Sequence, residues 1–400
     1  MTPLRVAYLD MNSFFASVEQ ELDPALRGKP VAITAVDSNS GACVAASYEA
    51  KAFGVRTGTR VADARRLCPG IIFLPSRHRL YVRFNLAVAD VLDRYAELTH
   101  IRSVDEFQLA LSGDAQTLDG ACALVAQLKA AVAKEVGPRL RFSAGLGPNH
   151  LLAKIAGKLD KPDGLQWLSP DNMPERIAHL SLDDLPGISR AMKERLFRAG
   201  VYDVVSLCQL DPRHARQIWR SVEGERFVRM LQGMDIPIIA TQRGGYGNSK
   251  VLAPEFRAPR RAYQVGRWLV EKATARLRRD GRVAARFSLT VSFFEGSTWA
   301  RGVSCFPTQD TAFFLRLHRA LWRALWRNGP PGPISSLGVN LTEVDLLDRR
   351  QGDLLAPLAP AERTRGERVS VAVDQINARF GDGMIRYGIH AAHPGFFERG

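Results

Sequence analysis

Alternation of apolar and polar side chains predicts the strands of this chain. Phe107, Leu109 and Leu111 recur at the period of a half-buried strand. A short strand is also expected from Arg5 to Leu9, followed directly by Asp10 and by a helix whose apolar residues begin at Phe14. Further strands are predicted at 29–34, 42–46, 71–74 and 140–145.

Helices are predicted where apolar residues recur every three or four positions. Leu151, Leu152, Ile155 and Leu159 share one face of a helix, while Lys154 and Lys158 lie off that face. The break at Lys161-Pro162-Asp163-Gly164 closes this part of the chain. Other helices are expected at 48–51, at 118–134, at 190–199 and in a segment that ends near 95.

The second half of the chain predicts a ferredoxin-like domain. Phe287, Leu289, Val291 and Phe293 alternate with polar residues, so this strand has one buried and one exposed face. The expected order is strand, helix, strand, strand, helix, strand. The predicted elements lie at 249–256, 260–279, 283–294, 298–306, 311–327 and 334–344, after a linker at 236–247 and before a helix at 368–379 and a strand at 384–387.

Composition narrows the class of protein. The 400 residues suggest two to four domains, and 55 Lys and Arg against 41 Asp and Glu give a net charge of +14. Such an excess favours a polyanionic partner such as nucleic acid, although a basic surface without such a partner is the alternative. The five scattered cysteines indicate neither a disulfide framework nor a zinc site, and no run of eighteen apolar residues or signal peptide is present. We expect a soluble cytoplasmic chain with no membrane association.

Three carboxylates are predicted at strand ends. Asp105 and Glu106 precede the Phe107 strand, and Asp10 follows the first strand. An Asp-Glu pair is often only a solvated turn, and Asp10 could simply cap the next helix. Because neighbouring side chains of a regular strand point to opposite faces, Asp105 and Glu106 serve one site only if the backbone turns there.

Brought together in a basic α/β domain, these carboxylates are a ligand set for two hard divalent cations. Mg²⁺ prefers oxygen ligands and often shares its sphere with substrate phosphates. Two such ions about 3.5 to 4 Å apart can activate an attacking hydroxyl and stabilise a leaving pyrophosphate. The set therefore predicts phosphoryl or nucleotidyl transfer. The carboxylate spacing alone does not separate a polymerase from a nuclease.

Two further features suit contact with a DNA backbone. The Leu185-Pro186-Gly187-Ile188 turn before a helix has the pattern of a helix-hairpin-helix, whose backbone N–H groups can bind phosphate. An ordinary packing turn is the alternative. The ferredoxin-like segment adds a group of arginines whose shared positive charge suits contact with a DNA backbone. The alternative interpretation is a charged helix that only faces solvent. The arginines are Arg257, Arg260, Arg261, Arg267, Arg276, Arg278, Arg279 and Arg286.

Several motifs together resemble the Y family of DNA polymerases, specifically its DinB, or DNA polymerase IV, branch. The motifs follow one another in the order typical of that family and cover nearly the whole chain. They are Leu9-Asp10-Met11-Asn12-Ser13-Phe14-Phe15, Tyr48-Glu49-Ala50-Lys51 with Phe53-Gly54-Val55, Ser103-Val104-Asp105-Glu106, Ser143-Ala144-Gly145-Leu146-Gly147-Pro148-Asn149 with Leu152-Ala153-Lys154, Lys161-Pro162-Asp163-Gly164, and Leu185-Pro186-Gly187-Ile188.

The resemblance implies a multidomain α/β protein with the right-hand polymerase architecture. An α/β palm, small fingers and a helical thumb with the helix-hairpin-helix would be joined to a ferredoxin-like little finger. The implied bounds are 1–19 and 78–165 for the palm, 20–77 for the fingers, 166–235 for the thumb, 236–247 for the linker, 248–345 for the little finger and 346–400 for a C-terminal tail.

The resemblance also implies roles for single residues. Asp10, Asp105, Glu106 and the carbonyl of Met11 would bind two Mg²⁺ ions, with Mn²⁺ as a substitute. Phe15 would be a steric gate against a ribose 2′-OH, or else only an apolar residue of its helix. The other implied site residues are Phe14, Tyr48, Lys51 and Lys161 for the nucleotide, Ala42 and Val44 for the base-pair pocket, Pro186, Gly187, Ile188, Arg257 and Arg286 for DNA, and Gln351, Asp353, Leu354 and Leu355 for a sliding clamp.

The implied activity is low-fidelity translesion synthesis, in which dNTPs are added to the primer of a primer–template DNA. A monomer in the cytoplasm, associated with the nucleoid, is expected. The chain departs from the DinB pattern at Asn12, Ala45, Lys51 and His150, and these departures could weaken triphosphate binding. In the clamp peptide, Gly352 and Leu355 differ from the usual Leu and Phe. A catalytically silent Y-family accessory protein, which binds DNA, clamp and other polymerases, is the alternative function, and a metal-dependent nuclease is a third.

Overall fold

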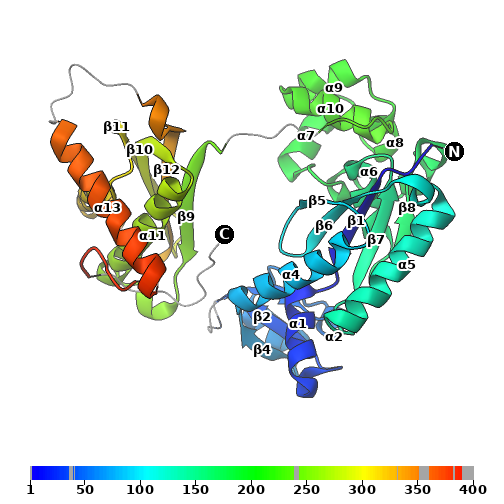
Figure 1. Cartoon of the computed structure of the whole chain (residues 1–400), viewed down its shortest axis with the longest axis horizontal. Helices are drawn as coiled ribbons and strands as arrows, with labels where there is room; N and C mark the ends of the chain where they lie inside the picture. The colour runs from blue at the N-terminus through cyan, green and yellow to red at the C-terminus, as the bar shows by residue number, and fades with distance from the viewer. Residues whose placement is uncertain are drawn as a thin grey trace. The chain divides into compact units, whose positions relative to one another are not determined.

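The computed structural model describes residues 2–35, 39, 41–237, 243–330, 332–350, 360–381 and 383–389. The chain forms two compact units that divide near residue 240 (Figure 1). Within the described ranges, no helix is long and apolar enough to cross a bilayer.

A five-stranded sheet organises the described part of the first unit. Its strand order is β5-β6-β1-β7-β8, with β1 at the centre and antiparallel to both neighbours. The elements are β1 (Val6–Met11), α1 (Phe14–Leu22), α4 (His78–Asp93), β5 (Leu98–Ile101), β6 (Glu106–Ala110), α5 (Leu118–Glu135), β7 (Phe142–Gly147), α6 (His150–Leu159) and β8 (Leu165–Trp167).

The two faces of β1 pack against different helices. Ala7 and Leu9 point into the large core that also contains residues of α4 and α5. Val6 and Tyr8 point to the opposite face and contact Ala153 of α6. Because side chains alternate along a strand, Asp10 lies on the same face as Tyr8. The sheet therefore presents Asp10 to the side covered by α6.

Two smaller assemblies complete the first unit. A three-stranded sheet with the order β3-β2-β4 packs with two short helices around its own core. A group of helices surrounds another core that also takes in one side of α6. The bounds are β2 (Val31–Thr34), β3 (Cys43–Ala46), α2 (Tyr48–Ala52), α3 (Val61–Leu67), β4 (Ile72–Pro75), α7 (Arg190–Arg198), α8 (Val204–Cys208), α9 (Pro212–Trp219) and α10 (Val222–Leu231).

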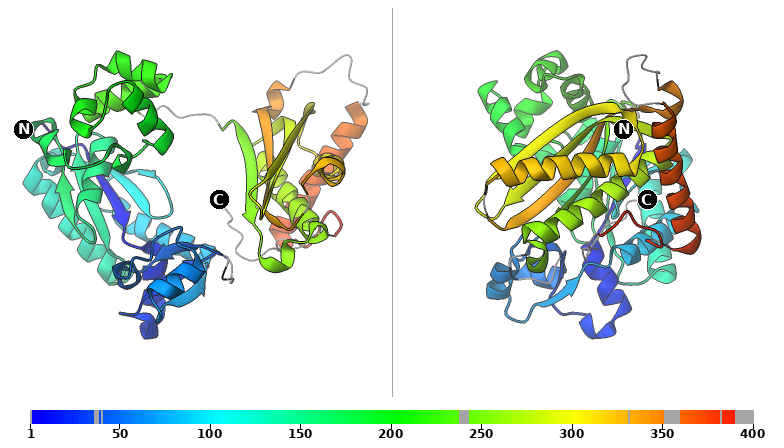
Figure 2. Two further views of the ribbon diagram at one scale, coloured as in Figure 1. Left: turned by 180° about the vertical axis from the view of Figure 1, so that it is seen from behind. Right: turned by 90° about the vertical axis from the view of Figure 1, so that its left-hand side faces the viewer.

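The second unit is a four-stranded antiparallel sheet with the order β11-β10-β12-β9. Its helices cover one face, where the alternating residues of β10 are buried (Figure 2). The other face carries the polar residues of the same strands. The bounds are β9 (Gly245–Val251), α11 (Pro259–Arg279), β10 (Arg282–Phe293), β11 (Thr298–Thr308), α12 (Thr311–Asn328), β12 (Ile334–Leu346) and α13 (Pro360–Phe380).

The predicted fold class is confirmed, including the ferredoxin-like order of the second unit. Some elements differ from the prediction. Strands β5 and β8 were not predicted, because their short sequences show no clear alternation. The segment 384–387 is not a strand, and β9 begins at Gly245, inside the expected linker. The predicted final helix is longer, since α13 starts at Pro360.

Contacts with the C-terminal region give two of the expected DNA-binding arginines acceptors within the chain. The side chain of Arg278 is only 5% exposed and donates to both carboxylate oxygens of Asp374 on α13, at 2.6 and 2.9 Å. Arg267 donates to the backbone carbonyl oxygens of Tyr387 and Ile389. These two arginines therefore hold the fold together, and the sequence pattern alone could not reveal their acceptors.

A neutral histidine in the second core makes this unit sensitive to acid. His318 is fully buried and stacks on Tyr263, with ring centroids 5.0 Å apart. Neither ring nitrogen has a hydrogen-bond partner in the structure. Burial, aided by the charge of Arg267, lowers the pKa of His318 to about 3. Since the unfolded chain binds this proton near its ordinary pKa, stability is lost as the pH falls below that value.

We therefore expect the His318→Leu variant to resist acid better than the wild-type protein. Between pH 7 and pH 5 the wild-type second unit should lose about 2 kcal/mol of unfolding free energy that the variant retains. Urea denaturation at both pH values, followed by tryptophan fluorescence, measures the difference. Equal losses in the two proteins would contradict the assignment of a neutral buried imidazole.

Candidate active site

Strand pairing brings two of the predicted carboxylates together. Asp10, near the end of β1, lies directly opposite Glu106, the first residue of β6. Directly opposed residues of an antiparallel pair share one face of the sheet. Asp105 precedes β6, and its carbonyl oxygen accepts a 2.8 Å hydrogen bond from the amide of Met11. The three acids, predicted from distant parts of the sequence, therefore belong to one site.

Small residues let α6 approach this site closely. A Cβ atom at Gly145 of β7 would overlap the carbonyl oxygen of Ala153, and one at Gly147 would lie 2.8 Å from the amide nitrogen of Ala153. This close packing brings Lys154 over the acids. Its ammonium group donates to Glu106 Oε1 at 2.7 Å and to the Tyr8 hydroxyl at 2.9 Å.

A second lysine holds Asp10. Lys161 Nζ lies 2.5 Å from Asp10 Oδ1. Lys51 Nζ donates to Ser13 Oγ at 2.7 Å and lies 4.2 Å from the centre of the Tyr48 ring. Burial, together with the positive charge of Lys161, lowers the pKa of Lys51. Lysines from three segments thus crowd around the carboxylates and repel one another, which favours the binding of an anion.

The acids also influence one another. Burial raises the pKa of Asp105, and the charges of Asp10 and Glu106 add to the rise, against the 2.5 Å hydrogen bond from Ser103. Burial would also raise the pKa of Glu106, but the hydrogen bond and charge of Lys154 outweigh it and lower the pKa. The site therefore gathers carboxylates in a half-buried place, and their negative charge requires positive charge nearby.

The carboxylates are not arranged as a preformed metal cluster. Within the described residues, no group of three or more His, Cys, Asp or Glu side chains has that arrangement. Asp10 and Glu106 instead bind lysines. The chemistry of the donor set still fits hard divalent cations, because three carboxylates meet at one strand end and their charge must be balanced.

Asn12 links the first strand to the loop that carries Lys161. Its side chain is buried, donates to Ser143 Oγ at 3.1 Å and accepts from the Asp163 amide at 2.8 Å. Asp163 has a left-handed backbone, with φ of 59°, and also binds Lys129 at 3.0 Å. Asn12, one of the departures from the DinB pattern, therefore has a structural role in holding this loop.

The other departures have distinct surroundings. Ala45 is half-buried and packs against the main core. His150 begins α6, and burial with the nearby charge of Arg102 lowers its pKa to about 4. His150 is therefore uncharged at neutral pH.

Phe15 is held by a fixed aromatic neighbour. Its ring stacks on Tyr81 with centroids 4.2 Å apart and planes 14° apart. The Tyr81 hydroxyl donates to the buried Glu19 at 2.7 Å, and Arg77 binds the same carboxylate. Phe14 is 3% exposed and lies in the core, so only its backbone is available to a ligand.

The small three-stranded sheet presents the remaining nucleotide candidates. Ala42 is exposed and Val44 half-buried, and they alternate with the buried Cys43, so they share one face. Tyr48 begins α2, with Ser47 as its N-cap. Burial and the charge of Asp10 raise the pKa of Tyr48, which indicates that its hydroxyl is near that acid.

The predicted DNA-binding residues lie in two places. Gly187 has a φ of +91° and sits before α7, whose N-cap is Ser189, while Ile188 is buried. The element before this turn is a single 3₁₀ turn at Leu182–Asp184 rather than an α-helix.

In the second unit, the two arginines to which the resemblance gives a DNA-binding role, Arg286 and Arg257, differ in their contacts. Arg286 lies on the polar face of β10 and donates to Ser304 at 3.3 Å. Arg257 lies over the Phe294 ring and donates to the carbonyl oxygen of Leu252.

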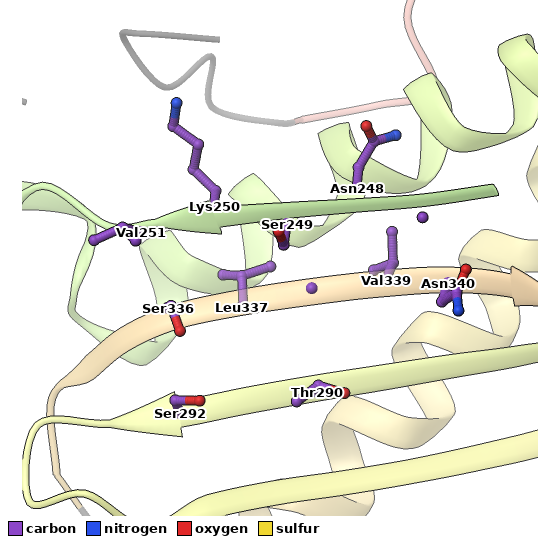
Figure 3. Close-up of a pocket in the computed structure, with 12 residues that line it drawn as sticks. Asn248, Ser249, Lys250, Val251, Thr290, Ser292, Ser336, Leu337, Val339 and Asn340 are labelled. Atoms are coloured by element: carbon purple, nitrogen blue, oxygen red, sulfur yellow. The ribbon is translucent and has the colours of Figure 1, made fainter. Parts of the chain in front are cut away.

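The polar face of the second sheet is hollowed. Figure 3 shows Thr290 and Ser292 of β10 on this hollow, which has a volume of about 400 Å³. Gly338 and Gly247 lie on the same face and carry no side chains. Backbone can therefore approach a ligand closely here.

Some predicted residues are not described by the structure, and two residues at the site were not predicted. Gln351, Asp353, Leu354 and Leu355 lie outside the described residues. Sequence reasoning assigned no role to Tyr8 or Lys154, although both contact the Glu106 environment. The period of two between Tyr8 and Asp10, and the position of Lys154 off the apolar face of its helix, were the available signals.

Comparison with known proteins identifies similar sequences along most of the chain. Residues 9–158 match the impB/mucB/samB family, and residues 243–354 match the C-terminal domain of that family. A DNA polymerase IV of Pelotomaculum thermopropionicum is 31% identical, over 98% of this chain and 96% of that protein. DNA polymerase IV 1 of Bacillus subtilis is 28% identical, over 96% and 92%.

Solved structures share the fold. A Y-family DNA polymerase chimera of Dbh and Dpo4 matches with a TM-score of 0.70 and 21% identity, over 86% of this chain and 99% of that one. An insertion ternary complex of Dbh DNA polymerase matches the same shares with a TM-score of 0.55 and 23% identity.

The role of Asn12 can be measured without any ligand. In Asn12→Ala the Asp163 amide loses its acceptor, and we expect hydrogen exchange in the 160–164 segment to become roughly fivefold faster, as for the loss of about 1 kcal/mol. Asn12→Asp is the control, because its carboxylate still accepts from Asp163. Equal protection of this segment in wild type and Asn12→Ala would contradict the link.

Proposed function

The chain belongs to the impB/mucB/samB family and, like the DNA polymerase IV proteins, to the Y family of DNA polymerases, and we propose that it adds dNTPs to the 3′-OH of a DNA primer. The activity is template-directed and serves translesion synthesis in the tolerance of DNA damage. A purely accessory role without catalysis is not favoured, since the full set of acids is present at one strand end.

The observation that carries this proposal is the joint presence of converging acids and crowded lysines. Acids at the end of β1 and the start of β6 need positive charge, and Lys51, Lys154 and Lys161 need negative charge. A triphosphate that arrives with divalent cations meets both needs at once. A nuclease site would not require the neighbouring Phe15 and Tyr48 segments.

The acids would hold two Mg²⁺ ions, which Mn²⁺ could replace. Asp10, Asp105, Glu106 and the carbonyl oxygen of Met11 would be their ligands, with Glu106 serving the activation of the primer 3′-OH. Bound there, the ions supply activation of the 3′-OH and stabilisation of the leaving pyrophosphate. Lys154 and Lys161 now hold Glu106 and Asp10 in place, at 2.7 and 2.5 Å.

The other residues of the first unit would orient the nucleotide. Lys51 and Lys161 would bind the triphosphate, aided by the hydroxyl of Tyr48. The ring of Phe15, fixed against Tyr81, would exclude a ribose 2′-OH. Ala42 and Val44 are small, which would leave a tolerant space over the nascent base pair.

We assign the predicted palm, fingers, thumb, linker, little-finger and tail bounds to this chain as part of the proposal. DNA would contact the Pro186-Gly187-Ile188 turn and the polar face of the second sheet with Arg286 and Arg257. The hollow of that sheet and its glycines support the assignment. In this proposal the protein is a monomer in the cytoplasm, associated with the nucleoid, and it contacts a sliding clamp through residues Gln351 to Leu355.

Primer extension tests the central proposal. With Mg²⁺, dNTPs and a short primer–template, we expect Asp105→Asn and Glu106→Gln each to reduce extension roughly a hundredfold or more, because charge at the reacting centre is lost. Asp114→Asn, an exposed acid of the same unit, is the control.

DNA affinity, measured by fluorescence anisotropy, should remain close to wild type in both variants. Absence of extension by the wild-type protein, with DNA binding retained, would favour the accessory function instead. Degradation of the primer without dNTPs would favour the nuclease.

The gate is tested by sugar selection. In Phe15→Ala we expect the preference for dNTPs over NTPs to fall about tenfold or more, since the steric barrier to the 2′-OH is gone. Tyr81→Phe keeps the stacked ring and should keep the preference. Single-nucleotide incorporation rates with dNTP and NTP measure it, and an unchanged ratio in Phe15→Ala would remove the gate role.

A further inference from the structure

Helix α12 carries a row of arginines on its exposed face. Arg316, Arg319, Arg323 and Arg327 are all exposed. Their spacing of three, four and four residues places them along one side of the helix, over about 16 Å. Arginines four residues apart repel one another, so this row costs helix stability unless a partner binds it.

The row has no acidic partner in the described part of the chain. None of the four guanidinium groups makes an ion pair there, although Arg316 lies over the Phe313 ring at 5.5 Å. Acids of α13, which packs against α12, and the acid before α12 are engaged elsewhere. Glu367 binds Arg350, Asp374 binds Arg278, and Asp310 caps α12.

An exposed tryptophan accompanies the arginines. Trp326 is 60% exposed on the same side of α12, between Arg323 and Arg327 in sequence. It is fixed from below by the buried Trp322, whose ring centroid lies 6.2 Å away in an edge-to-face geometry. An exposed indole ring beside free cations is a stacking platform with an electrostatic guide.

This face points away from the hollowed polar face of the sheet. The buried residues of α12, such as Phe314 and Leu321, pack on the apolar side of the sheet, so its exposed arginines lie on the far side of the helix layer. In the right-hand view of Figure 2, α12 runs in front of the sheet. The arginine row is therefore a separate surface from the one assigned above to primer–template DNA.

We propose that the exposed face of α12 binds single-stranded DNA. The arginines contact successive phosphates, and Trp326 stacks on an unpaired base, which a duplex does not offer. The strong net positive charge of the chain is consistent with this partner. The proposal concerns binding alone and does not depend on catalysis.

The test uses the full chain and a fluorescein-labelled oligothymidine, with an excess of unlabelled hairpin primer–template to occupy the other DNA surface. We expect Arg319→Gln with Arg323→Gln to weaken binding roughly tenfold and to reduce the slope of log affinity against log salt by about 1.4, which is two lost phosphate contacts. Trp326→Ala should weaken binding about fivefold or more with the slope unchanged.

Controls separate this surface from general charge and from the active site. Arg365→Gln with Arg368→Gln removes the same charge from exposed positions of α13 and should leave binding within twofold. Thermal unfolding must match wild type in all variants, and primer extension on a template with a short overhang should be unchanged in the α12 variants. Absence of primer extension by the wild-type protein would contradict the proposed polymerase function and would leave the proposal for α12 unaffected.

Two results would overturn the proposal. One is wild-type affinity and salt slope for oligothymidine in both the double-arginine variant and Trp326→Ala. The other is equally tight binding of polyglutamate at the same salt, weakened by the arginine changes but not by Trp326→Ala, which would identify an acidic protein as the partner.

Discussion

Charge balance at the end of β1 is the constraint on which this site depends. The charges of Asp10 and Glu106 add to the rise in the pKa of Asp105 and are compensated by Lys161 and Lys154, while burial and Lys161 lower the pKa of Lys51. Each set is costly alone in a half-buried place. The ion pairs satisfy both sets of charges, and in the proposed function a substrate that carries phosphates and divalent cations would satisfy them instead.

Close packing of α6 on the sheet makes that balance possible. Gly145 and Gly147 remove the side chains that would keep the helix away, and Ala153 occupies the space. Lys154 then reaches Glu106 and Tyr8 from above the sheet. Asn12 ties the Lys161 loop to β7, so the acids and their counter-charges are positioned by the same sheet and the segments bonded to it.

Sequence reasoning predicted the elements with strong periodicity and the acids at their ends. Asp10, Asp105 and Glu106 could be found because β1 and β6 show clear apolar patterns. Strands β5 and β8 could not, since they have four and three residues and gain stability from neighbours rather than from their own pattern. The contacts of Asn12 and Arg278 depend on partners far along the chain, which a local pattern does not encode.

The pair between Arg278 and Asp374 also fixes where the second unit can be cut. The similarity to the C-terminal family domain ends at residue 354, but α13 follows and neutralises a guanidinium group that is only 5% exposed. A fragment that stops at the family boundary would lose Asp374 and would keep only the acceptors of Arg278 at Gln309 and Thr311. The compact second unit thus extends beyond the segment matched by the family, and expression fragments should retain α13.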